Sequence, residues 1–422
     1  MIEQCDYLIV GGGVAGGHAA YEIRKNDKKG TIVVVTAENQ FPYDRPPLSK
    51  EYLAGKKKRN EVFFRADSYY SRNKIEVVKP HHVESMDTSR NRITIDGGRE
   101  FSYKTLLLST GGRPRRLNLP GAHLQGIYYL RTLLDCDAIR KASSSAKKVA
   151  IIGGGFIGCE VAATLRGKRK DVTLIEMAPR LLSAAIDEET ASWLKEYHVK
   201  KGVKVLLNSS VSQFVGSGDK VEGVELIDGT NVAADFVVVG VGIELNTELA
   251  EGAGIKTDKG VVVNEHLETS VPNIYAAGDI AKFYSPLFKR YLRLEHVDVA
   301  QKQGAIAGEN MTGKKKKKKK SFDEPPYFFS NQYDLEINAY GDLSQHSHVL
   351  RRGALDARKG FIQFYFDEEI LNGILTVNAK WSDIEEAKSL IAVEAKYDRS
   401  MLADESRPLK SIARKVTRKG RS

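Results

Sequence analysis

Short apolar runs alternate with glycine-rich turns and helical stretches in the first part of the chain. The run at 7–10 predicts a buried strand, and a glycine cluster, a helical stretch at 17–25 and a β-branched run at 31–35 follow it. The same succession returns at 149–152, 159–168 and 172–175. Strands that alternate with helices in this way are typical of the α/β class with parallel sheets.

The last part of the chain has a different pattern. Two apolar runs, 360–366 and 374–377, predict antiparallel strands, and the segment 382–392 has the spacing of an amphipathic helix. No apolar run approaches the roughly 18 residues that span a bilayer, and the N-terminus lacks the basic region of a secretory signal. We therefore expect a cytoplasmic protein without a membrane span, in which two α/β units are joined to a smaller α+β domain.

Each copy of the repeated unit carries the pattern G-x-G-x-x-G between its strand and its helix: Gly11, Gly13 and Gly16 in the first copy, and Gly153, Gly155 and Gly158 in the second. The first glycine permits a tight turn, the second lets the backbone approach a pyrophosphate, and the third lets the helix pack closely on the strand. The free N–H groups at the start of the helix then attract the phosphates. Ala15 and Ile157, which precede the third glycines, belong to the same predicted cofactor sites.

An acidic residue follows each glycine loop at the distance where dinucleotide-binding units bond a ribose hydroxyl. Glu38 lies 22 residues after Gly16, and Glu176 lies 18 residues after Gly158. Two such units predict that the chain binds two dinucleotides. A carboxylate at Glu176 favours NADH because it repels the 2′-phosphate of NADPH, although the nearby Arg180 keeps NADPH as the alternative. Glu38 is also compatible with a solvated position.

Composition restricts the chemistry that the side chains can do alone. The three cysteines include no Cys-x-x-Cys pair, which excludes a disulfide framework and a local zinc cluster and requires a bound cofactor for two-electron chemistry. The net charge of +11 comes mainly from seven consecutive lysines at 314–320 and from a basic tail at 396–422. We interpret both segments as solvated. The alternative is an electrostatic guide for an acidic partner, and no motif indicates specific nucleic-acid binding.

Six motifs carry a family resemblance. They stand at 42–50 (PYDRPPLSK), 108–114 (LSTGGRP), 158–160 (GCE), 273–279 (NIYAAGD), 295–296 (EH) and 326–330 (PYFFS). With the glycine loops, they make the segment 5–395 similar to the FAD-dependent pyridine-nucleotide oxidoreductases, and within these it resembles the ferredoxin reductase and apoptosis-inducing-factor branch. The resemblance implies a glutathione-reductase-like fold, with two Rossmann-like dinucleotide-binding domains and a small α+β C-terminal domain.

The segment 44–50 decides the branch, because it stands where the disulfide reductases of this superfamily carry redox cysteines and contains none. The resemblance therefore implies a non-covalently bound FAD that passes electrons directly to an external acceptor. It also implies that Lys50 and Glu160 are the catalytic residues and form a pair beside the flavin and the nicotinamide. A positive charge at Lys50 stabilises negative charge on reduced flavin. For both residues, an ordinary helix surface charge is the alternative.

Further cofactor contacts follow from the resemblance. Thr110 and Gly111 stand at the crossover beside FAD and Gly242 at the return crossover beside NADH, although a plain turn is the alternative for each. The other FAD contacts are Gly278 and Asp279 at the ribityl chain, Glu295, His296 and Val297 near the ring, Phe329 in the C-terminal domain, and Arg45 at the phosphates. Arg45 is equally compatible with pairing to a surface acid. Relatives often carry tryptophans where Val297 and Phe329 stand.

The positions of the motifs predict the domain boundaries. A discontinuous FAD-binding domain comprises 1–112 and 243–320, and an NAD(H)-binding domain is inserted at 113–242. A C-terminal interface domain follows at 321–395, and we expect 396–422 to form an extended or mobile basic tail. Because the third domain often contributes to dimers in the family, a homodimer is among the predicted assemblies.

These assignments predict an oxidoreductase that takes hydride from NADH onto FAD and passes single electrons to a ferredoxin-type iron–sulfur protein, which we expect to be acidic. A second hypothesis is an NADH oxidase or NADH:quinone reductase, which shares the first half-reaction. A third is a non-enzymatic, NADH-sensing flavoprotein like apoptosis-inducing factor, which the lysine run and the tail suggest.

Overall fold

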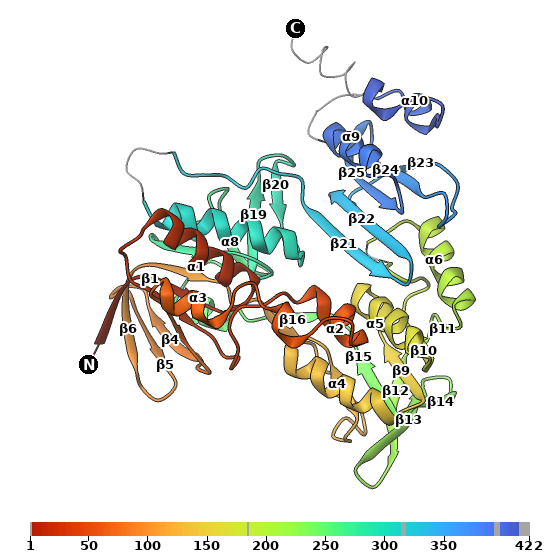
Figure 1. The fold of residues 1–422 in the computed structure, drawn as a ribbon, viewed down its shortest axis with the longest axis horizontal. Coiled ribbons are helices and arrows are strands. Elements are labelled where there is room, and N and C mark those ends of the chain that lie inside the picture. The colour runs from red at the N-terminus through yellow and green to blue at the C-terminus, as the bar shows by residue number, and fades with distance from the viewer. Residues whose placement is uncertain (1, 184, 314–317, 392–396, 413–422) are drawn as a thin grey trace. The chain divides into compact units, whose positions relative to one another are not determined.

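The computed structural model describes residues 2–183, 185–313, 318–391 and 397–412. Their contacts divide the chain into two compact units, each assembled from segments that are separate in sequence. The first unit contains Met1–Arg45, Lys58–Arg113 and Ile243–Glu324, and the second contains Pro46–Lys57, Pro114–Gly242 and Pro325–Ser422. The helices and strands are labelled in Figure 1.

The first unit is built on a seven-stranded sheet with the order β3-β2-β1-β6-β5-β4, in which β18 also pairs with β6. Its strands are β1 (Ile2–Val10), β2 (Ile32–Val35), β3 (Ile75–Val78), β4 (Val83–Asp87), β5 (Arg92–Ile95), β6 (Glu100–Leu108) and β18 (Ile274–Ala276). The first three strands, β6 and β18 run parallel, and Leu8 lies opposite Val33 and Leu106. Because parallel strands are buried on both faces, the predicted runs at 7–10 and 31–35 are continuously apolar.

Smaller elements complete the first unit. Its helices are α1 (Val14–Asn26), η2 (Arg59–Val62), α3 (Asp67–Arg72), α7 (Glu248–Gly252) and α8 (Val297–Met311). A three-stranded sheet consists of β17 (Val261–Val263), β19 (Ala281–Ser285) and β20 (Arg290–Leu292), and β7 (Gly112–Pro114) pairs with β16 (Ile243–Leu245).

Helices α1 and α8 lie side by side, and small residues set their separation (Figure 1). A Cβ atom at Gly304 would collide with the carbonyl oxygen of Ala15, and one at Gly308 would meet the backbone of Ala19. Both alanines are buried. The close approach of the two backbones holds the start of α1 in place.

The second unit has a parallel five-stranded sheet with the order β11-β10-β9-β15-β8. Its strands are β8 (Ile127–Tyr129), β9 (Lys148–Ile152), β10 (Asp171–Ile175), β11 (Lys204–Leu206) and β15 (Phe236–Val239), and a separate antiparallel sheet contains β12 (Val211–Ser217), β13 (Lys220–Leu226) and β14 (Asn231–Ala233). The helices are η1 (Pro46–Ser49), α2 (Glu51–Ala54), α4 (Leu133–Ser145), α5 (Phe156–Gly167) and α6 (Glu188–Lys200). Helices α4 and α6 begin after Thr132 and Asp187, whose side chains accept backbone N–H groups of the first turn.

An antiparallel sheet with the order β21-β22-β25-β24-β23 lies C-terminal in the same unit. Its elements are β21 (Tyr327–Gln332), β22 (Leu335–Gly341), β23 (His348–Arg352), β24 (Phe361–Asp367) and β25 (Ile370–Val377), followed by α9 (Trp381–Ile391). The strands predicted at 360–366 and 374–377 correspond to β24 and β25, and the predicted helix 382–392 corresponds to α9.

Residues 397–412 differ from the extended tail that the sequence predicts. They contain α10 (Arg399–Ala403), and Leu402 and Leu409 are fully buried. The buried Arg352 on β23 donates hydrogen bonds of 2.7 to 3.1 Å to three carbonyl oxygens between residues 402 and 407. Apolar residues spaced among the charges thus bind this part of the tail to the sheet, where an arginine satisfies its carbonyl groups.

The segment 46–57 lies in the second unit, although the sequence assigns it to the FAD-type domain. The Thr164 hydroxyl donates to the Ser49 carbonyl oxygen at 2.8 Å, and the Tyr52 hydroxyl donates to Asp137 at 2.5 Å. Both contacts connect the segment to helices of the second unit, α5 and α4. The first-unit segment therefore ends at Arg45, just before Pro46 and Pro47, and the helical turns that follow pack on α4 and α5 of the second unit.

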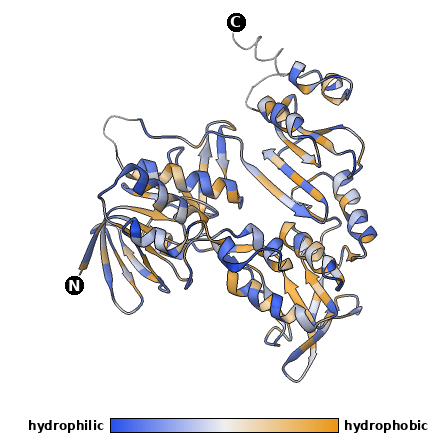
Figure 2. Ribbon diagram, viewed as in Figure 1, coloured by the Kyte–Doolittle hydropathy of each residue, from blue (hydrophilic) through white to orange (hydrophobic). Residues whose placement is uncertain are grey.

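Hydropathy follows this architecture, as Figure 2 shows, because the central strands are largely hydrophobic whereas α6 is mostly hydrophilic. None of the helices that the structure describes is both long enough and apolar enough to cross a membrane.

The contact between α1 and α8 generates a stability prediction. Gly304→Ala should lower the free energy of unfolding by about 1–3 kcal/mol, because its methyl group has no space against Ala15. The control is Gly252→Ala on α7, where a Cβ would meet no atom within 4 Å, and this change should leave stability equal or slightly higher. Urea unfolding of the purified variants measures both. Equal losses in the two variants would contradict the packing argument.

Candidate functional site

The two glycine loops have the same backbone geometry. Gly11 and Gly153 have φ angles of +111° and +108°, a region that L side chains rarely adopt. A Cβ at either residue would also collide with a carbonyl oxygen of the neighbouring strand end. Gly16 and Gly158 pack so closely that a Cβ would collide with the carbonyl oxygen of the first glycine of the loop. Each loop therefore requires glycine at its first and last positions.

The middle glycines face open space instead. Gly13 and Gly155 are the N-cap residues of α1 and α5, and a Cβ at either position would meet nothing within 4 Å. Because glycine has no side chain, neither N-cap residue caps the N–H groups of the first helical turn. This combination of open space and free N–H donors fits a pyrophosphate. The two sites therefore suit the two dinucleotides that the sequence predicts.

Glu176 lies directly beside the second loop. Its carboxylate accepts hydrogen bonds from the N–H groups of Gly154 at 2.5 Å and Ala178 at 2.7 Å. These bonds fix the carboxylate at the carboxyl end of β10. A carboxylate in this place is available to a ribose hydroxyl and unfavourable for a 2′-phosphate.

Glu38 is held by its own neighbours in the first unit. It accepts a hydrogen bond of 2.5 Å from the Tyr43 hydroxyl and pairs with Arg45 at 2.6 Å. The sequence left two partners open for Arg45, the FAD phosphates and an acidic side chain, and in the structure Arg45 pairs with the acidic side chain of Glu38. Burial lowers the pKa of the Arg45 guanidinium, and the nearby Asp279 carboxylate is among the groups that more than offset this effect.

The predicted crossover at Thr110 and Gly111 is locked to Asn246. The Thr110 hydroxyl donates to the Asn246 carbonyl oxygen at 3.0 Å, and the Asn246 amide donates to the Thr110 carbonyl oxygen at 2.9 Å. The Asn246 N–H donates to Gly111 at 3.0 Å. On the return path, the Gly242 carbonyl oxygen accepts the Arg115 N–H at 3.0 Å. These bonds tie the two crossing strands together.

Gly278 and Asp279 follow β18 and lie against the start of α1. A Cβ at Gly278 would lie 3.2 Å from the side chain of Ala15. The Gly278 N–H donates to the buried Gln303 side chain on α8 at 3.0 Å. Asp279 is thus placed beside the first glycine loop, within the same unit.

The predicted ring contacts Glu295, His296 and Val297 lie where α8 begins. Glu295 pairs with Arg293 at 2.8 Å, His296 is the N-cap residue, and Val297 packs against the core. Burial lowers the pKa of His296 to about 4. His296 is therefore neutral at physiological pH.

Lys50 and Glu160 form a buried ion pair in the second unit. Lys50 Nζ lies 2.9 Å from Glu160 Oε2, and the two side chains are only 8% and 4% exposed. The hydroxyl of Ser49 donates to the same oxygen, and the hydroxyl of Ser330 donates to Oε1 at 2.8 Å. The Lys50 ammonium also lies 5.5 Å from the centre of the Phe329 ring. The carboxylate is thus satisfied on both oxygens.

Two residues near this pair have contrasting environments. Ile157, in the first turn of α5, is 44% exposed, so it presents an apolar side chain at the end of the glycine loop. Cys159 in the same turn is fully buried, and burial raises the pKa of its thiol. Cys159 therefore packs as a small apolar residue.

The predicted site residues fall into two groups. The first unit brings together Gly11, Gly13, Ala15, Gly16, Glu38, Arg45, Thr110, Gly111, Gly278, Asp279, Glu295, His296 and Val297. The second unit brings together Lys50, Gly153, Gly155, Ile157, Gly158, Glu160, Glu176, Gly242 and Phe329. The predicted pairing of Lys50 with Glu160 is present in the second unit, where the ring of Phe329 lies near the Lys50 ammonium.

Four polar residues around Glu160 are absent from the sequence predictions. Ser49 and Ser330 lie at the ends of the motifs at 42–50 and 326–330, so a signal for them existed. Gln332 and His198 continue the hydrogen bonds beyond Ser330. Nothing in the sequence indicates His198, because it stands on an amphipathic helix remote from every motif.

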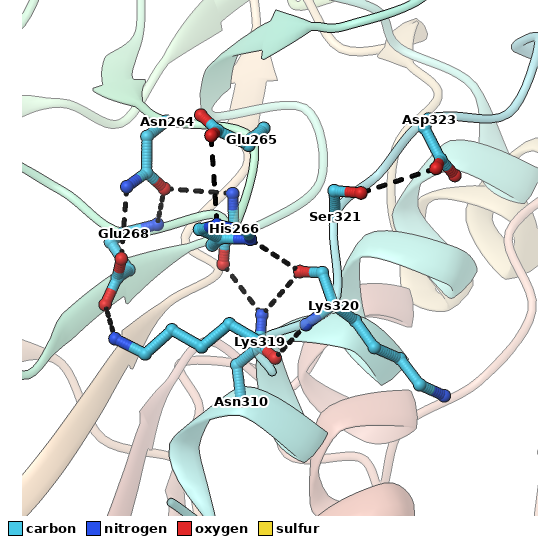
Figure 3. Close-up of polar contacts among 9 residues, drawn as sticks. All are labelled: Asn264, Glu265, His266, Glu268, Asn310, Lys319, Lys320, Ser321 and Asp323. Carbon is cyan, nitrogen blue, oxygen red and sulfur yellow. Dashed lines mark hydrogen bonds and ion pairs between the residues drawn. The ribbon is translucent and has the colours of Figure 1, made fainter. Parts of the chain in front are cut away.

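The last lysines of the basic run are bound within the first unit (Figure 3). Asn310, near the end of α8, accepts the Lys320 N–H at 2.9 Å and donates to the Lys320 carbonyl oxygen at 2.9 Å. His266 Nδ1 lies 3.1 Å from the same carbonyl oxygen. Lys319 and Lys320 both pair with glutamates of the unit. Residues 314–317 of the run lie outside the described residues.

Comparison with known proteins assigns both parts of the chain. Residues 5–304 match the model of the pyridine nucleotide-disulphide oxidoreductases, and residues 327–413 match the reductase C-terminal domain. The chain is 34% identical to putidaredoxin reductase CamA of Pseudomonas putida, over 96% of each chain. It is 35% identical to the ferredoxin reductase subunit of 5,5'-dehydrodivanillate O-demethylase from Sphingobium sp., over 96% of this chain and 98% of that relative.

Solved structures agree with these matches. The crystal structure of the covalent putidaredoxin reductase–putidaredoxin complex is similar to this chain, with a TM-score of 0.93 and 33% sequence identity. The match covers 98% of this chain and 99% of the other.

The buried ion pair predicts an asymmetric loss of stability. Glu160→Gln should cost roughly 3–5 kcal/mol, because it leaves the Lys50 ammonium buried without a charged partner. Lys50→Met should cost less, since two serine hydroxyls still donate to the carboxylate. The double variant should be more stable than the sum of the single losses predicts. Denaturant unfolding at pH 7 measures the cycle, and additive losses would show that the pair is not coupled.

Proposed function

The chain belongs to the pyridine nucleotide-disulphide oxidoreductase family, and on that premise we propose that it is an FAD-dependent NADH oxidoreductase that delivers electrons to a ferredoxin-type iron–sulfur protein. The observation that carries the proposal is the presence of two dinucleotide loops in a chain whose three cysteines are all buried and unpaired. Two dinucleotides can exchange a hydride, but no disulfide receives the electrons. An external acceptor must therefore do so.

The relatives support the choice of acceptor. Those matched along nearly their whole length are named putidaredoxin reductase and ferredoxin reductase, and the matched crystal structure contains putidaredoxin. A bound flavin accepts a hydride and releases electrons one at a time, which connects a two-electron donor to a one-electron acceptor.

The first unit supplies the FAD-binding residues in this proposal. The N–H groups at the start of α1 and the open space at Gly13 suit the pyrophosphate. Glu38 is the acceptor for a ribose hydroxyl, and Asp279 is the acceptor for the ribityl hydroxyls. Arg45, which pairs with Glu38, orients that carboxylate and contributes positive charge near the phosphates.

The second unit supplies the nicotinamide dinucleotide site. Gly155 leaves the space for its pyrophosphate, and Glu176 is the acceptor for the adenosine ribose. The fixed carboxylate of Glu176 supports NADH as the preferred donor and NADPH as the poorer one. Ile157 and Gly242 line the same loop and return crossover.

Lys50 and Glu160 are the proposed catalytic residues. The buried ammonium of Lys50 contributes a positive charge that favours the electron-rich state of the flavin. Glu160 compensates that charge and presents a carboxylate to the nicotinamide end of the donor. Phe329 covers the Lys50 ammonium with its ring.

Several properties stay predictions. The acceptor is expected to be acidic because the chain carries a net charge of +11. We also expect a cytoplasmic location, a homodimer and domain boundaries at 112, 242, 320 and 395.

The deciding experiment is an anaerobic titration with NADH, followed by the flavin absorbance. The purified protein should be yellow, and about one equivalent of NADH should bleach it; a [2Fe–2S] ferredoxin added next should restore the colour as it is reduced. NADPH, tested in parallel, should act more slowly. A colourless protein that FAD does not reconstitute would refute the proposal. Oxygen consumption that equals the rate of ferredoxin reduction would favour an oxidase instead.

The second loop provides a matched pair of variants. Gly155→Ala should raise the KM for NADH by about tenfold, roughly 1.4 kcal/mol, because its methyl group enters the space for the pyrophosphate without touching protein atoms. Gly153→Ala should instead destabilise the protein, because it combines a positive φ with a backbone collision. Steady-state kinetics and thermal unfolding separate the two effects. An unchanged KM in a folded Gly155→Ala protein would place the nucleotide elsewhere.

A further inference from the structure

A continuous chain of hydrogen bonds leads from Glu160 through the C-terminal sheet to helix α6. Ser330 Oγ lies 2.8 Å from Glu160 Oε1, and Gln332 Nε2 lies 3.1 Å from Ser330 Oγ. His198 Nε2 lies 2.9 Å from Gln332 Oε1, and the Tyr333 hydroxyl lies 3.0 Å from His198 Nδ1. Ser330, Gln332 and His198 are completely buried. The chain thus joins three elements, α5, β21 and α6, of the second unit.

With a neutral His198 ring, only one arrangement of protons satisfies every link. The Glu160 carboxylate accepts, so Ser330 must donate to it and accept from the Gln332 amide. The Gln332 oxygen is then the acceptor for an N–H at Nε2 of His198. Burial lowers the pKa of His198 to about 4, so the neutral ring carries its single proton on Nε2. Nδ1 therefore accepts from the Tyr333 hydroxyl, and every donor points toward Glu160.

The backbone at Tyr333 indicates that its hydroxyl is needed. Tyr333 and Asp334 form the two-residue loop between β21 and β22. Tyr333 has a φ of +57°, in the left-handed region that favours glycine or asparagine and is unfavourable for an aromatic residue. Glycine would relieve that strain because it has no Cβ atom. Tyrosine at this position instead brings a hydroxyl to His198 at the outer end of the chain.

Helix α6, which carries His198, is bound to the C-terminal sheet at both ends. The hydrogen-bond chain can therefore fix the position of the groups that it joins. Its first turn is bound to β24, where the Tyr365 hydroxyl donates to Asp187 at 2.8 Å and the Thr190 hydroxyl donates to Gln363 at 2.7 Å. Its C-terminal end is bound near the hairpin, because the Lys201 ammonium donates to Asp334 at 2.7 Å. His198 therefore has a fixed place between two anchored ends.

A purely structural contact would not require this chemistry. A buried polar network is no more stabilising than well-packed apolar side chains of the same shape, and it demands that every group be satisfied. The network differs from apolar packing because its hydrogen bonds are directional. Each donor polarises the next, and the last donor binds the Glu160 carboxylate in a defined direction. A carboxylate with donors on both oxygens has one preferred orientation.

We propose that Ser330, Gln332, His198 and Tyr333 are positioning residues that hold the Glu160 carboxylate in one orientation for hydride transfer from the nicotinamide. The proposal rests on the proposed function for the role of Glu160. The four residues contact neither the nicotinamide nor the flavin in this scheme and act only through Glu160. Their loss should change the rate of flavin reduction more than the affinity for NADH.

The proton arrangement can be tested without turnover. In the holoprotein labelled with ¹⁵N-histidine, the signal that disappears in His198→Gln belongs to His198. Its two nitrogens should show the Nε2–H tautomer, unchanged from pH 8 to pH 5.5. An Nδ1–H tautomer, or protonation of the ring above pH 5.5, would reverse part of the chain and overturn the proposal. This measurement stays decisive even if NADH fails to reduce the protein.

Anaerobic stopped-flow reduction of the holoprotein by NADH tests the function of the chain. Ser330→Ala should slow flavin reduction about tenfold and Tyr333→Phe about threefold, with the NADH dissociation constant within twofold of wild type. Ser330→Thr, which keeps a hydroxyl, should restore most of the rate. His198→Gln, which keeps an amide donor near Nε2, should react faster than His198→Leu.

The matched control is Tyr197→Phe. It removes a tyrosine hydroxyl bonded to the same hairpin, but this hydroxyl lies outside the chain. Tyr197→Phe should reduce flavin at the wild-type rate, although it loses as much thermal stability as Tyr333→Phe. Equal slowing by both tyrosine variants would show that the hydrogen-bond chain is merely structural. A wild-type rate in Ser330→Ala would show the same, and either result would make the proposal wrong.

Discussion

The packing of the second unit around α5 depends on one buried negative charge, the carboxylate of Glu160. The Glu160 carboxylate is nearly inaccessible, and such a group is tolerated only where opposite charge and hydrogen-bond donors surround it. The donors come from two places in the sequence, the turn at 46–50 and strand β21, and the carboxylate itself stands on α5. Because Lys50 belongs to the turn, the segment 46–57 must pack with α5. The need to compensate the Glu160 carboxylate therefore explains why the segment 46–57 belongs to the second unit, although the residues before and after it in sequence belong to the first unit.

The two glycine loops have the same backbone geometry but different neighbouring residues. Both have a first glycine with φ near +110° and an open second position at the start of a helix. Around the first loop, α8 approaches so closely that Gly304 must be glycine, and Asp279 and Arg45 add polar groups. Around the second loop, Glu176 is held by backbone N–H groups, and Glu160 follows inside the helix. We propose that the two similar loops bind phosphate in the same way and that their different neighbours distinguish the cofactors.

The C-terminal sheet does more than cover an apolar surface. Strand β21 inserts Ser330 and Gln332 between α5 and α6, and strands β24 and β23 of the same sheet bind the first turn of α6 through tyrosine, glutamine and arginine side chains. Polar contacts of this kind are specific in geometry, whereas apolar packing tolerates sliding. The sheet consequently fixes the orientation of groups at the proposed catalytic pair from a distance.

Local sequence determined the parts that depend on local physics. The strands and helices around Gly11 and Gly153, the acids Glu38 and Glu176, the strands β24 and β25 and the helix α9 all follow from glycine spacing and from hydrophobic periodicity, because each depends on neighbours within about 25 residues. The pairing of Lys50 with Glu160 was inferred from family resemblance, and the contact between them is present. Tertiary structure alone decided which unit holds the segment 46–57, how Arg352 binds residues 402–407, and that His198 reaches Glu160 through Gln332 and Ser330. Apart from the step between Gln332 and Ser330, these contacts join residues at least 50 positions apart. Their partners are therefore set by how whole elements pack, and no local pattern records that packing.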